Sequence, residues 1–317
     1  MSAKTRPPEI PRTADSFEAS VGALRVRLTN LGKPFWKSPA VTKSDLLRYY
    51  AAISPWLLPH VKDRAMVMKR YPNGAGGDFF FMKHVPQPHP PWLATCKIEH
   101  GEERIVEFPM VNDLASLLWI VNLGCIDLNQ WYALCDDPDR PDYFHFDLDP
   151  VPGATFERVC ETALIVHDAL ERLDMPNFAK TTGSRGIHIY VPIKRGPVQK
   201  DVWVFSKALA MQIAEENPKL ITAVYAKSKR PRGHVLIDYN QNAWGRTLAS
   251  IYSVRAAKRP TVSAPVTWRE LEKGVRLDDF DIGNMEARLR KVGDLWKPLL
   301  ARTGRVDLAK FLKKGAA

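Results

Sequence analysis

The sequence predicts an α/β fold, because segments typical of strands alternate with segments typical of helices along most of its 317 residues. Hydrophobic residues make up 45% of the chain, which is enough for one large core or two modest ones. No internal repeat or low-complexity tract interrupts the alternation. We therefore expect a mixed α/β architecture in which central β-sheets are flanked by helices.

The individual elements follow from apolar spacing, caps and turn residues. Helices are predicted at 43–53, 112–124, 155–173 and 201–216, and strands at 64–72, 144–150, 186–192 and 234–239. Asn112 is the expected N-cap of the second helix, and Gly124 is its expected C-terminal stop. Beyond about residue 259 the pattern changes to a capping box from Thr267 to Glu270, followed by a basic helical tail.

Composition divides the chain into three parts. Residues 1–20 contain three prolines and no periodic apolar positions, so we expect a flexible extension. Residues 21–259 are expected to form the main domain, and residues 260–317 a basic helical tail that packs on it. The start of the chain lacks the apolar run of a signal peptide, and no segment is long enough to span a bilayer. We therefore expect a cytoplasmic protein without membrane contact.

The charge balance points to a polyanionic partner. Lys and Arg outnumber Asp and Glu by 46 to 35, which gives a formal net charge of +11. A surplus of this size favours binding to nucleic acid. The four cysteines form no C-x-x-C pair and have no histidine at finger spacing, which argues against a zinc module.

The segment FHFDLDP carries two acids on a predicted strand. Successive strand side chains alternate between faces, so Phe144, Phe146 and Leu148 share one face. Asp147 and Asp149 project from the other, at the end of the strand. Oxygen ligands at this spacing suit Mg²⁺ or Mn²⁺, whose usual companion is a phosphate. The alternative is a strand end at which the two acids simply enter solvent.

Two further segments add chemistry to this pair. HVLIDYNQN places Asp238 at the end of another strand, where it is either a third metal ligand or a turn-forming residue bonded to nearby backbone. KTTGSRGIHIYVP offers hydroxyls, a cation, an imidazole and close backbone approach for a triphosphate, although such a loop alone is also an ordinary turn. The residues concerned are Thr182, Gly183, Ser184, Arg185, Gly186 and His188.

FDLDP, T-x-S-R-G-I-H and VLIDYNQN occur in an order that resembles the archaeo-eukaryotic primase superfamily. Within it, the chain resembles the bacterial LigD-type polymerase domain and its stand-alone relatives, including the ligase C-associated type, from about Leu28 to Ala257. The resemblance implies a primase-polymerase catalytic domain at 21–259. It also implies a DNA-dependent nucleotidyltransferase that extends primers across short gaps or joined ends in DNA repair, in a bacterial, nucleoid-associated setting.

The resemblance also assigns roles to residues around the acids. Asp147, Asp149 and Asp238 would hold two catalytic ions, Mn²⁺ or Mg²⁺. The family's nucleotide contacts fall in MKRYPNG, in the loop before His188 and in NQNAWGRTLASIYSVR. The nucleotide-binding residues so implied are Lys69, Thr182, Ser184, Arg185, Gly186, His188, Gln241 and Arg255. The basic run KSKRPRGH could track phosphates of the DNA or reach those of the nucleotide, the role in which Arg232 is a candidate. A solvated basic loop is the competing interpretation of KSKRPRGH.

A second set of positions resembles the family's DNA contacts. Lys33 and Lys43 match two lysines that bind the 5′-phosphate beyond a gap. Phe80 and Phe81, followed by Lys83, match aromatic residues that meet the template, since bases stack on exposed rings. The alternative is that the phenylalanine run belongs to the core, as we expect for Phe79. The implied partners are gapped or broken duplex DNA with a 5′-phosphate, nucleoside triphosphates, a separate DNA ligase and Ku.

One departure from the family lies before Trp131. Asn129 and Gln130 stand where the family has His-Pro, so the choice between ribo- and deoxyribonucleotides cannot be carried over. Two other functions compete with the polymerase. One is a catalytically weak module that binds DNA gaps or ends, and the other is a DxD sugar-nucleotide transferase, which gives no reason for the net positive charge.

Overall fold

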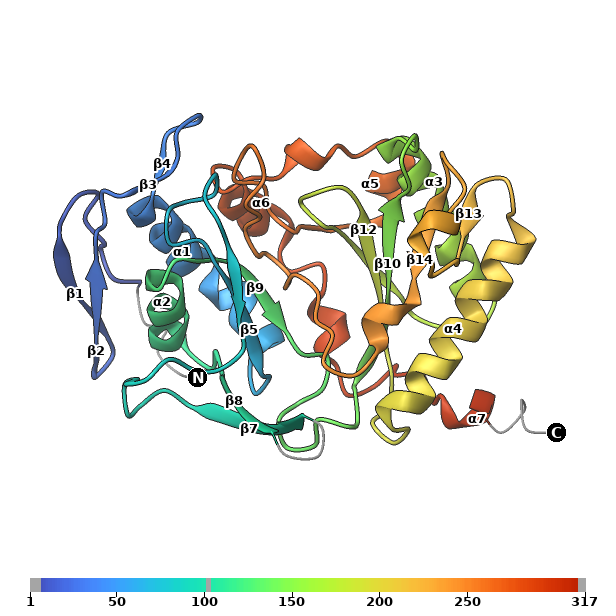
Figure 1. The fold of residues 1–317 in the computed structure, drawn as a ribbon, viewed down its shortest axis with the longest axis horizontal. Helices are drawn as coiled ribbons and strands as arrows, with labels where there is room; N and C mark the ends of the chain where they lie inside the picture. Colours follow the sequence, from blue (N-terminus) through green and yellow to red (C-terminus); the bar gives the residue numbers. More distant parts are fainter. Residues whose placement is uncertain (1–6, 101–103, 313–317) are drawn as a thin grey trace. The chain divides into compact units, whose positions relative to one another are not determined.

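The computed structural model describes residues 7–100 and 104–312. The chain forms two compact units, each assembled from segments that are far apart in the sequence (Figure 1). Unit 1 consists of the described parts of Met1–Gln130, Ala249–Val262 and Phe280–Gly293, and unit 2 of those of Trp131–Leu248, Ser263–Asp279 and Asp294–Ala317. The predicted boundary at residue 20 falls inside the first strand, and residues 260–312 contribute to both units.

Unit 1 contains short antiparallel sheets and three helices in its described residues. A three-stranded sheet has the order β6-β5-β9, and two-stranded pairs are formed by β1 with β2, β3 with β4, and β7 with β8. Its strands are β1 (Ser16–Val21), β2 (Leu24–Thr29), β3 (Pro34–Trp36), β4 (Val41–Thr42), β5 (Met66–Arg70), β6 (Phe80–Met82), β7 (Thr95–His100), β8 (Arg104–Pro109) and β9 (Cys125–Gln130). Its helices are α1 (Lys43–Val61), α2 (Leu114–Asn122) and α6 (Met285–Val292).

Local sequence explains how the helices of unit 1 begin and end. Thr42 and Asp45 form a capping box at the start of α1. The N-cap of α2 is Asp113 and not the predicted Asn112, because the Asp113 carboxylate accepts the Ser116 N–H, whereas the Asn112 amide is bonded to Asp63. The predicted stop after α2 is confirmed, since Gly124 has a φ of 82°, a conformation that favours glycine.

Unit 2 is built on one six-stranded sheet with the order β13-β14-β10-β12-β11-β15. All neighbours in it are antiparallel except β13 and β14. The strands are β10 (Tyr143–Pro150), β11 (Phe178–Thr181), β12 (Ile187–Pro192), β13 (Ile221–Thr222), β14 (Val235–Asp238) and β15 (Pro265–Val266). The helices are α3 (Phe156–Glu171), α4 (Gln199–Glu216), α5 (Trp268–Glu272) and α7 (Ala309–Leu312), and the 3-10 turns are η1 (Lys227–Lys229), η2 (Tyr239–Asn242), η3 (Leu277–Asp279) and η4 (Lys297–Leu300).

The core of unit 2 lies where α3 and α4 pack against β10 (Figure 1). Phe144, Phe146 and Leu148 are fully buried, and the Phe144 ring contacts Phe205 of α4. The predicted alternation along β10 is therefore correct, with its aromatic face turned to the helices. The late part of the chain adds to the same unit, because buried Trp296 donates its indole N–H to the Ala179 carbonyl.

No helix in the described stretches of the chain is both long and apolar enough to cross a membrane.

Candidate active site

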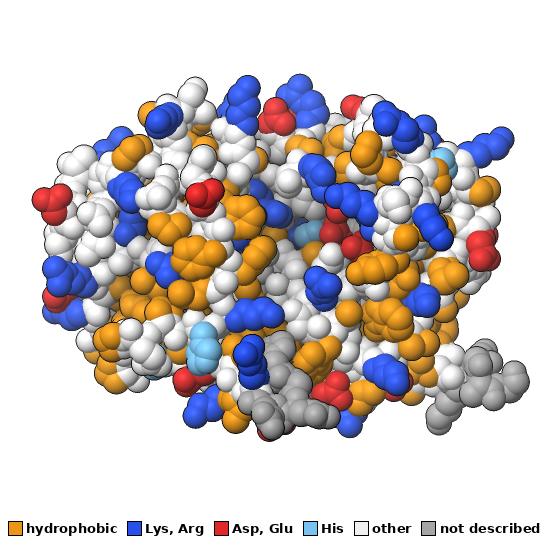
Figure 2. Space-filling view, viewed as in Figure 1, with side chains coloured by type: hydrophobic (Ala, Val, Ile, Leu, Met, Phe, Trp, Pro, Cys, Tyr) orange, Lys and Arg blue, Asp and Glu red, His pale blue; other side chains and the backbone are white. Residues whose placement is uncertain are grey.

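Four polar side chains form a row across the sheet of unit 2. Lys180 of β11 is in register with His188 of β12, His188 with Asp147 of β10, and Asp147 with Asp238 of β14. Residues in register on neighbouring strands project from the same face. Asp149 lies two residues beyond Asp147 on that face, so the sheet itself brings the three predicted acids together. Figure 2 shows acidic side chains in this region with a histidine and basic side chains beside them.

Burial and charge repulsion both act on this acidic group. Burial raises the pKa of Asp149 to about 7, and the neighbouring carboxylates of Asp147 and Asp238 add to the rise, while Arg185 opposes it. The closest basic contact of Asp149 is the Arg185 guanidinium, at 3.6 Å. Asp147 is buried and lies 3.2 Å from His188 Nε2. Burial and the neighbouring carboxylates thus both disfavour the charged form of Asp149.

Asp238 makes the turn bond that was one of its two predicted alternatives. Its Oδ1 accepts the backbone N–H of Asn240 at 2.9 Å, the local turn bond of a turn-forming aspartate. Its Oδ2 accepts the side-chain amide of Gln241 at 3.1 Å. Asn242 clamps the next part of η2 to β10 by bonding both backbone groups of His145. The turn therefore holds Asp238 against Asp147 without removing its carboxylate from the shared face.

The loop between β11 and β12 is held by Thr182. Its hydroxyl oxygen accepts backbone N–H groups from Ser184, Arg185 and Gly186 at 3.0–3.1 Å. Gly186 must be glycine, because a Cβ at this position would lie 2.1 Å from the Leu148 carbonyl oxygen. The loop thus approaches the backbone of β10 between the two acids, and Arg185 is thereby placed next to Asp149.

The basic run before β14 includes the short turn η1, and most of its side chains are exposed to solvent. Lys227, Lys229 and Arg232 are exposed to solvent. Arg230 donates to the carbonyls of Val224 and Tyr225, and its charge partly opposes the rise in the pKa of Asp149. The run therefore places positive charge near the acids of the same unit.

In unit 1, Lys69 and Arg255 meet around an acid that the sequence analysis did not single out. Asp127 of β9 is buried, and its Oδ2 lies 3.7 Å from Lys69 Nζ and 3.2 Å from Arg255 Nε. Burial raises the pKa of Asp127, and the two cations oppose that rise. The only signal in the sequence is an acid inside the strand CIDLNQ, whose partners are remote along the chain.

The two predicted phosphate lysines have different environments. Lys33 is exposed, whereas Lys43 is buried and its amine donates to the Thr29 carbonyl at 2.7 Å. Burial lowers the pKa of Lys43 to about 8, and repulsion from Lys33 and Arg70 contributes. Two cations are thus held close enough to repel each other, as at a site for an anion.

The phenylalanine run is not core: Phe79 directly precedes the edge strand β6, and Phe80 and Phe81 begin it. Phe79, Phe80 and Phe81 are 50%, 43% and 58% exposed, so the core placement expected for Phe79 is wrong. The reason is that β6 ends the sheet β6-β5-β9 and packs on one side only. Lys69 Nζ lies 3.9 Å from the centre of the Phe79 ring, and Lys83 is exposed just beyond the strand.

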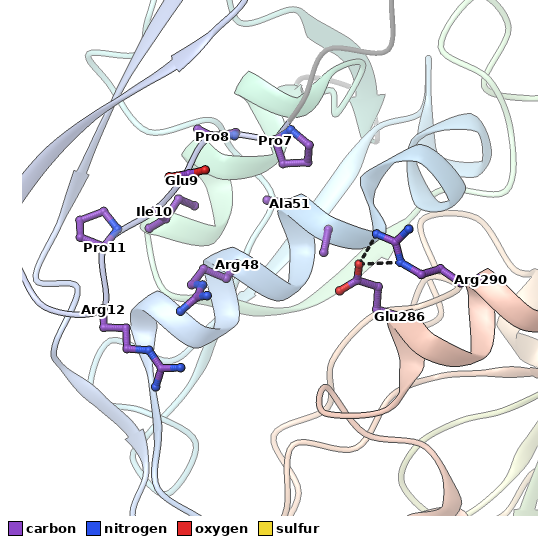
Figure 3. A pocket seen from close by; sticks show the side chains of 11 residues that line it. Pro7, Pro8, Glu9, Ile10, Pro11, Arg12, Arg48, Ala51, Glu286 and Arg290 are labelled. Carbon is purple, nitrogen blue, oxygen red and sulfur yellow. Dashed lines mark hydrogen bonds and ion pairs between the residues drawn. The ribbon is translucent and has the colours of Figure 1, made fainter.

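A separate cavity of about 630 Å³ lies elsewhere in unit 1 (Figure 3). Its wall includes Arg12, Arg48 and the Arg290–Glu286 ion pair. None of the predicted site residues lines it. The chemistry of the acids is therefore on the sheet of unit 2 and not in this cavity.

Clustered carboxylates on neighbouring strands, next to a glycine-containing hydroxyl loop, are typical of nucleotidyltransferases. The family model described as "LigD, primase-polymerase domain" matches residues 42–296. The chain belongs to this family. Domains of this family are DNA nucleotidyltransferases of non-homologous end joining.

Individual relatives support the assignment. The multifunctional non-homologous end joining protein LigD of Mycolicibacterium smegmatis is 34% identical over 87% of this chain and 36% of its own length. The corresponding protein of Pseudomonas aeruginosa is 28% identical over 96% of this chain and 37% of its own length. The polymerase domain of Mycobacterium tuberculosis ligase D, solved in complex with DNA, is 30% identical with a TM-score of 0.82, over 88% of this chain and 99% of that one. The chain thus spans little more than a third of the two full-length relatives.

Proposed function

We propose that this chain is a DNA-dependent nucleotidyltransferase that adds nucleotides to a primer 3′ end across short gaps or joined ends. The observation that carries the proposal is the convergence of Asp147, Asp149 and Asp238 on one face of one sheet, beside the Thr182 loop. The family assignment supports it.

The acids fit divalent cations. They are oxygen ligands, and Asp147 and Asp238 raise the pKa of Asp149 by repulsion although the Arg185 guanidinium lies 3.6 Å from it. Among the described residues, no group of three His, Cys, Asp or Glu side chains is arranged to hold a metal ion by itself. This fits Mg²⁺ or Mn²⁺, which are commonly held by one or two carboxylates plus substrate phosphates. Two such ions, when bound, would activate the primer hydroxyl and stabilise the leaving pyrophosphate.

The surrounding residues would bind the triphosphate and orient the acids. Gln241 holds Asp238 through its amide, and the Thr182 loop carries the Ser184 hydroxyl and the Arg185 guanidinium, which would bind phosphate oxygens. Arg232 would add a further cation. In unit 1 we assign Lys69 and Arg255 to the nucleotide as well, because Asp127 holds both cations in place.

The DNA contacts are proposed from exposure and charge. The Phe80 and Phe81 side chains are 43% and 58% exposed, and template bases would stack on their exposed rings. Lys33 and Lys43 would bind a 5′-phosphate, and Lys83 would bind the template backbone. A separate ligase would seal the product, and Ku would hold the ends. We assign the protein to the bacterial cytoplasm, at the nucleoid.

Primer extension on a short-gapped duplex with a 5′-phosphate tests the proposal. The wild type should incorporate nucleotides with Mn²⁺, and the variant with Asp147→Ala and Asp149→Ala should not. Parallel reactions with ribo- and deoxyribonucleotides would show what Asn129 and Gln130 do to sugar choice. A wild type that binds the gap without incorporating any nucleotide would contradict the polymerase proposal and favour an end-binding module.

A further inference from the structure

Lys180 is a buried lysine at the inner end of the polar row in unit 2. It is 0% exposed, although burying an ammonium group is costly unless its protons are bonded. Its Nζ lies 2.6 Å from Ser263 Oγ and 2.7 Å from His188 Nδ1. The Tyr190 and Trp296 rings lie 5.9 and 6.0 Å from the same nitrogen. Such enclosure indicates a defined task for this side chain.

The contact with Lys180 determines whether His188 Nδ1 carries a hydrogen. A lysine ammonium has three donors and no acceptor, so Nδ1 must accept the proton of the 2.7 Å hydrogen bond. A proton on Nδ1 would face the ammonium at that distance, which disfavours both the other neutral tautomer and the doubly protonated ring. The remaining ring nitrogen must then carry the hydrogen.

That hydrogen points toward the acids. His188 Nε2 lies 3.2 Å from Asp147 Oδ1, and a hydrogen on Nε2 turns its partial positive charge toward this carboxylate. In the opposite tautomer a lone pair would face the carboxylate, and repulsion would turn Asp147 or the ring away. His188 itself is 3% exposed and packed within the sheet row, so it has little freedom to respond by moving.

We infer that Lys180 is a positioning residue that fixes His188 as the Nε2–H tautomer and so orients Asp147. Its effect on catalysis rests on the proposed function, because Asp147 is a metal ligand only in that proposal. The tautomer itself does not depend on any activity. The strand register supports the arrangement, since Lys180, His188 and Asp147 occupy register positions on three adjacent strands.

The test begins with nuclear magnetic resonance of protein labelled with ¹⁵N-histidine, with the His188 signals assigned by their loss in His188→Gln. The wild type should show a protonated Nε2 and an unprotonated Nδ1. Lys180→Met keeps a side chain of similar length but removes its hydrogen-bond donors, so His188 should no longer be held in this single tautomer. Ser263→Ala, the matched control, removes the other lysine partner and should keep it. A wild-type proton on Nδ1 would overturn the inference whether or not Lys180→Met folds, as would an unchanged tautomer in folded Lys180→Met.

Gap filling provides the second readout. Lys180→Met should lower kcat by about 10–100-fold, the usual effect of losing a partner that orients a ligand, with KM for the nucleotide little changed. An unchanged kcat would refute the positioning role. If the wild type itself incorporates nothing, the proposed function fails while the tautomer result stands, so the two failures are distinguishable.

Discussion

Buried acids occur in both units, but their charges are treated differently. In unit 1, Asp127 has two cations, Lys69 and Arg255, against one carboxylate. In unit 2, Asp147 and Asp149 lie together with Asp238, and burial raises the pKa of Asp149, with repulsion from the other two acids adding to the rise. The acid of unit 1 has two cations of its own unit beside it, whereas the group in unit 2 brings three carboxylates together. A buried acid is thus held by ion pairs in unit 1 and joins further acids in unit 2.

The largest expected effect on stability comes from replacing Asp127, the acid that is paired with two cations. Asp127→Asn should lower the free energy of unfolding by about 3–5 kcal/mol, because it leaves Lys69 and Arg255 without their buried partner. Urea denaturation would measure it, with Asp136→Asn as a control, since that acid pairs with Arg195 at the surface. A loss no larger than the control would mean that Asp127 is not needed to hold the cations.

A smaller effect on stability is expected from the titration of Lys43, whose buried amine donates to the Thr29 carbonyl. Its folded-state pKa of about 8 lies below the unfolded value of 10.5, so the unfolded chain binds more protons between these values. Stability should therefore rise as the pH increases from 8 to 10.5, by at most about 3 kcal/mol. The rise should be smaller in Lys43→Met by that amount. Equal pH profiles in both proteins would contradict the pKa shift.

Gly186 tests how closely the loop must approach the acids. Gly186→Ala places a methyl group onto the Leu148 carbonyl, and the resulting overpacking should cost about 1–3 kcal/mol. Gly196→Ala is a matched control, since nothing lies within 4 Å of a Cβ there. Thermal denaturation would compare the two variants. Equal melting temperatures would mean that the loop has room to move from β10.

The smallest effect has the opposite sign. Asp149→Asn relieves repulsion within the acidic group, so without divalent ions it should raise the free energy of unfolding slightly, by about 1 kcal/mol or less. Added Mn²⁺ should then raise the melting temperature of the wild type more than that of the variant. A variant that is less stable in chelator would show that Asp149 already has sufficient compensation.

Sequence patterns correctly predicted features that depend on residues close together in the chain. The two faces of β10, the stop at Gly124 and the capping box from Thr267 to Glu270 were all correct. Asn112 failed as an N-cap because the neighbouring Asp113 offered a competing acceptor. Both residues are good caps, and only the bond from Asn112 to Asp63, 49 positions away, decided between them.

Pairing across strands could not be read from the sequence. Asp127 gains Arg255 over a separation of 128 residues, and Lys180 gains Ser263 over 83. Neither Asp127 nor Lys180 was singled out in the sequence, because each has its partner far away along the chain. Phe79 failed for a related reason, because an exposed edge strand and a buried one have the same apolar pattern. The roles of the predicted site residues remain to be tested by experiment.

The interleaving of the two units limits how this protein can be shortened. The chain changes unit after residues 130, 248, 262, 279 and 293, so no cut leaves one unit whole and the other absent. The last stretch supplies Trp296, which packs against Tyr190 of the central sheet. A ribosome must therefore release nearly the entire chain before either unit can finish folding, and a truncated fragment ending at 259 would expose both cores to proteolysis.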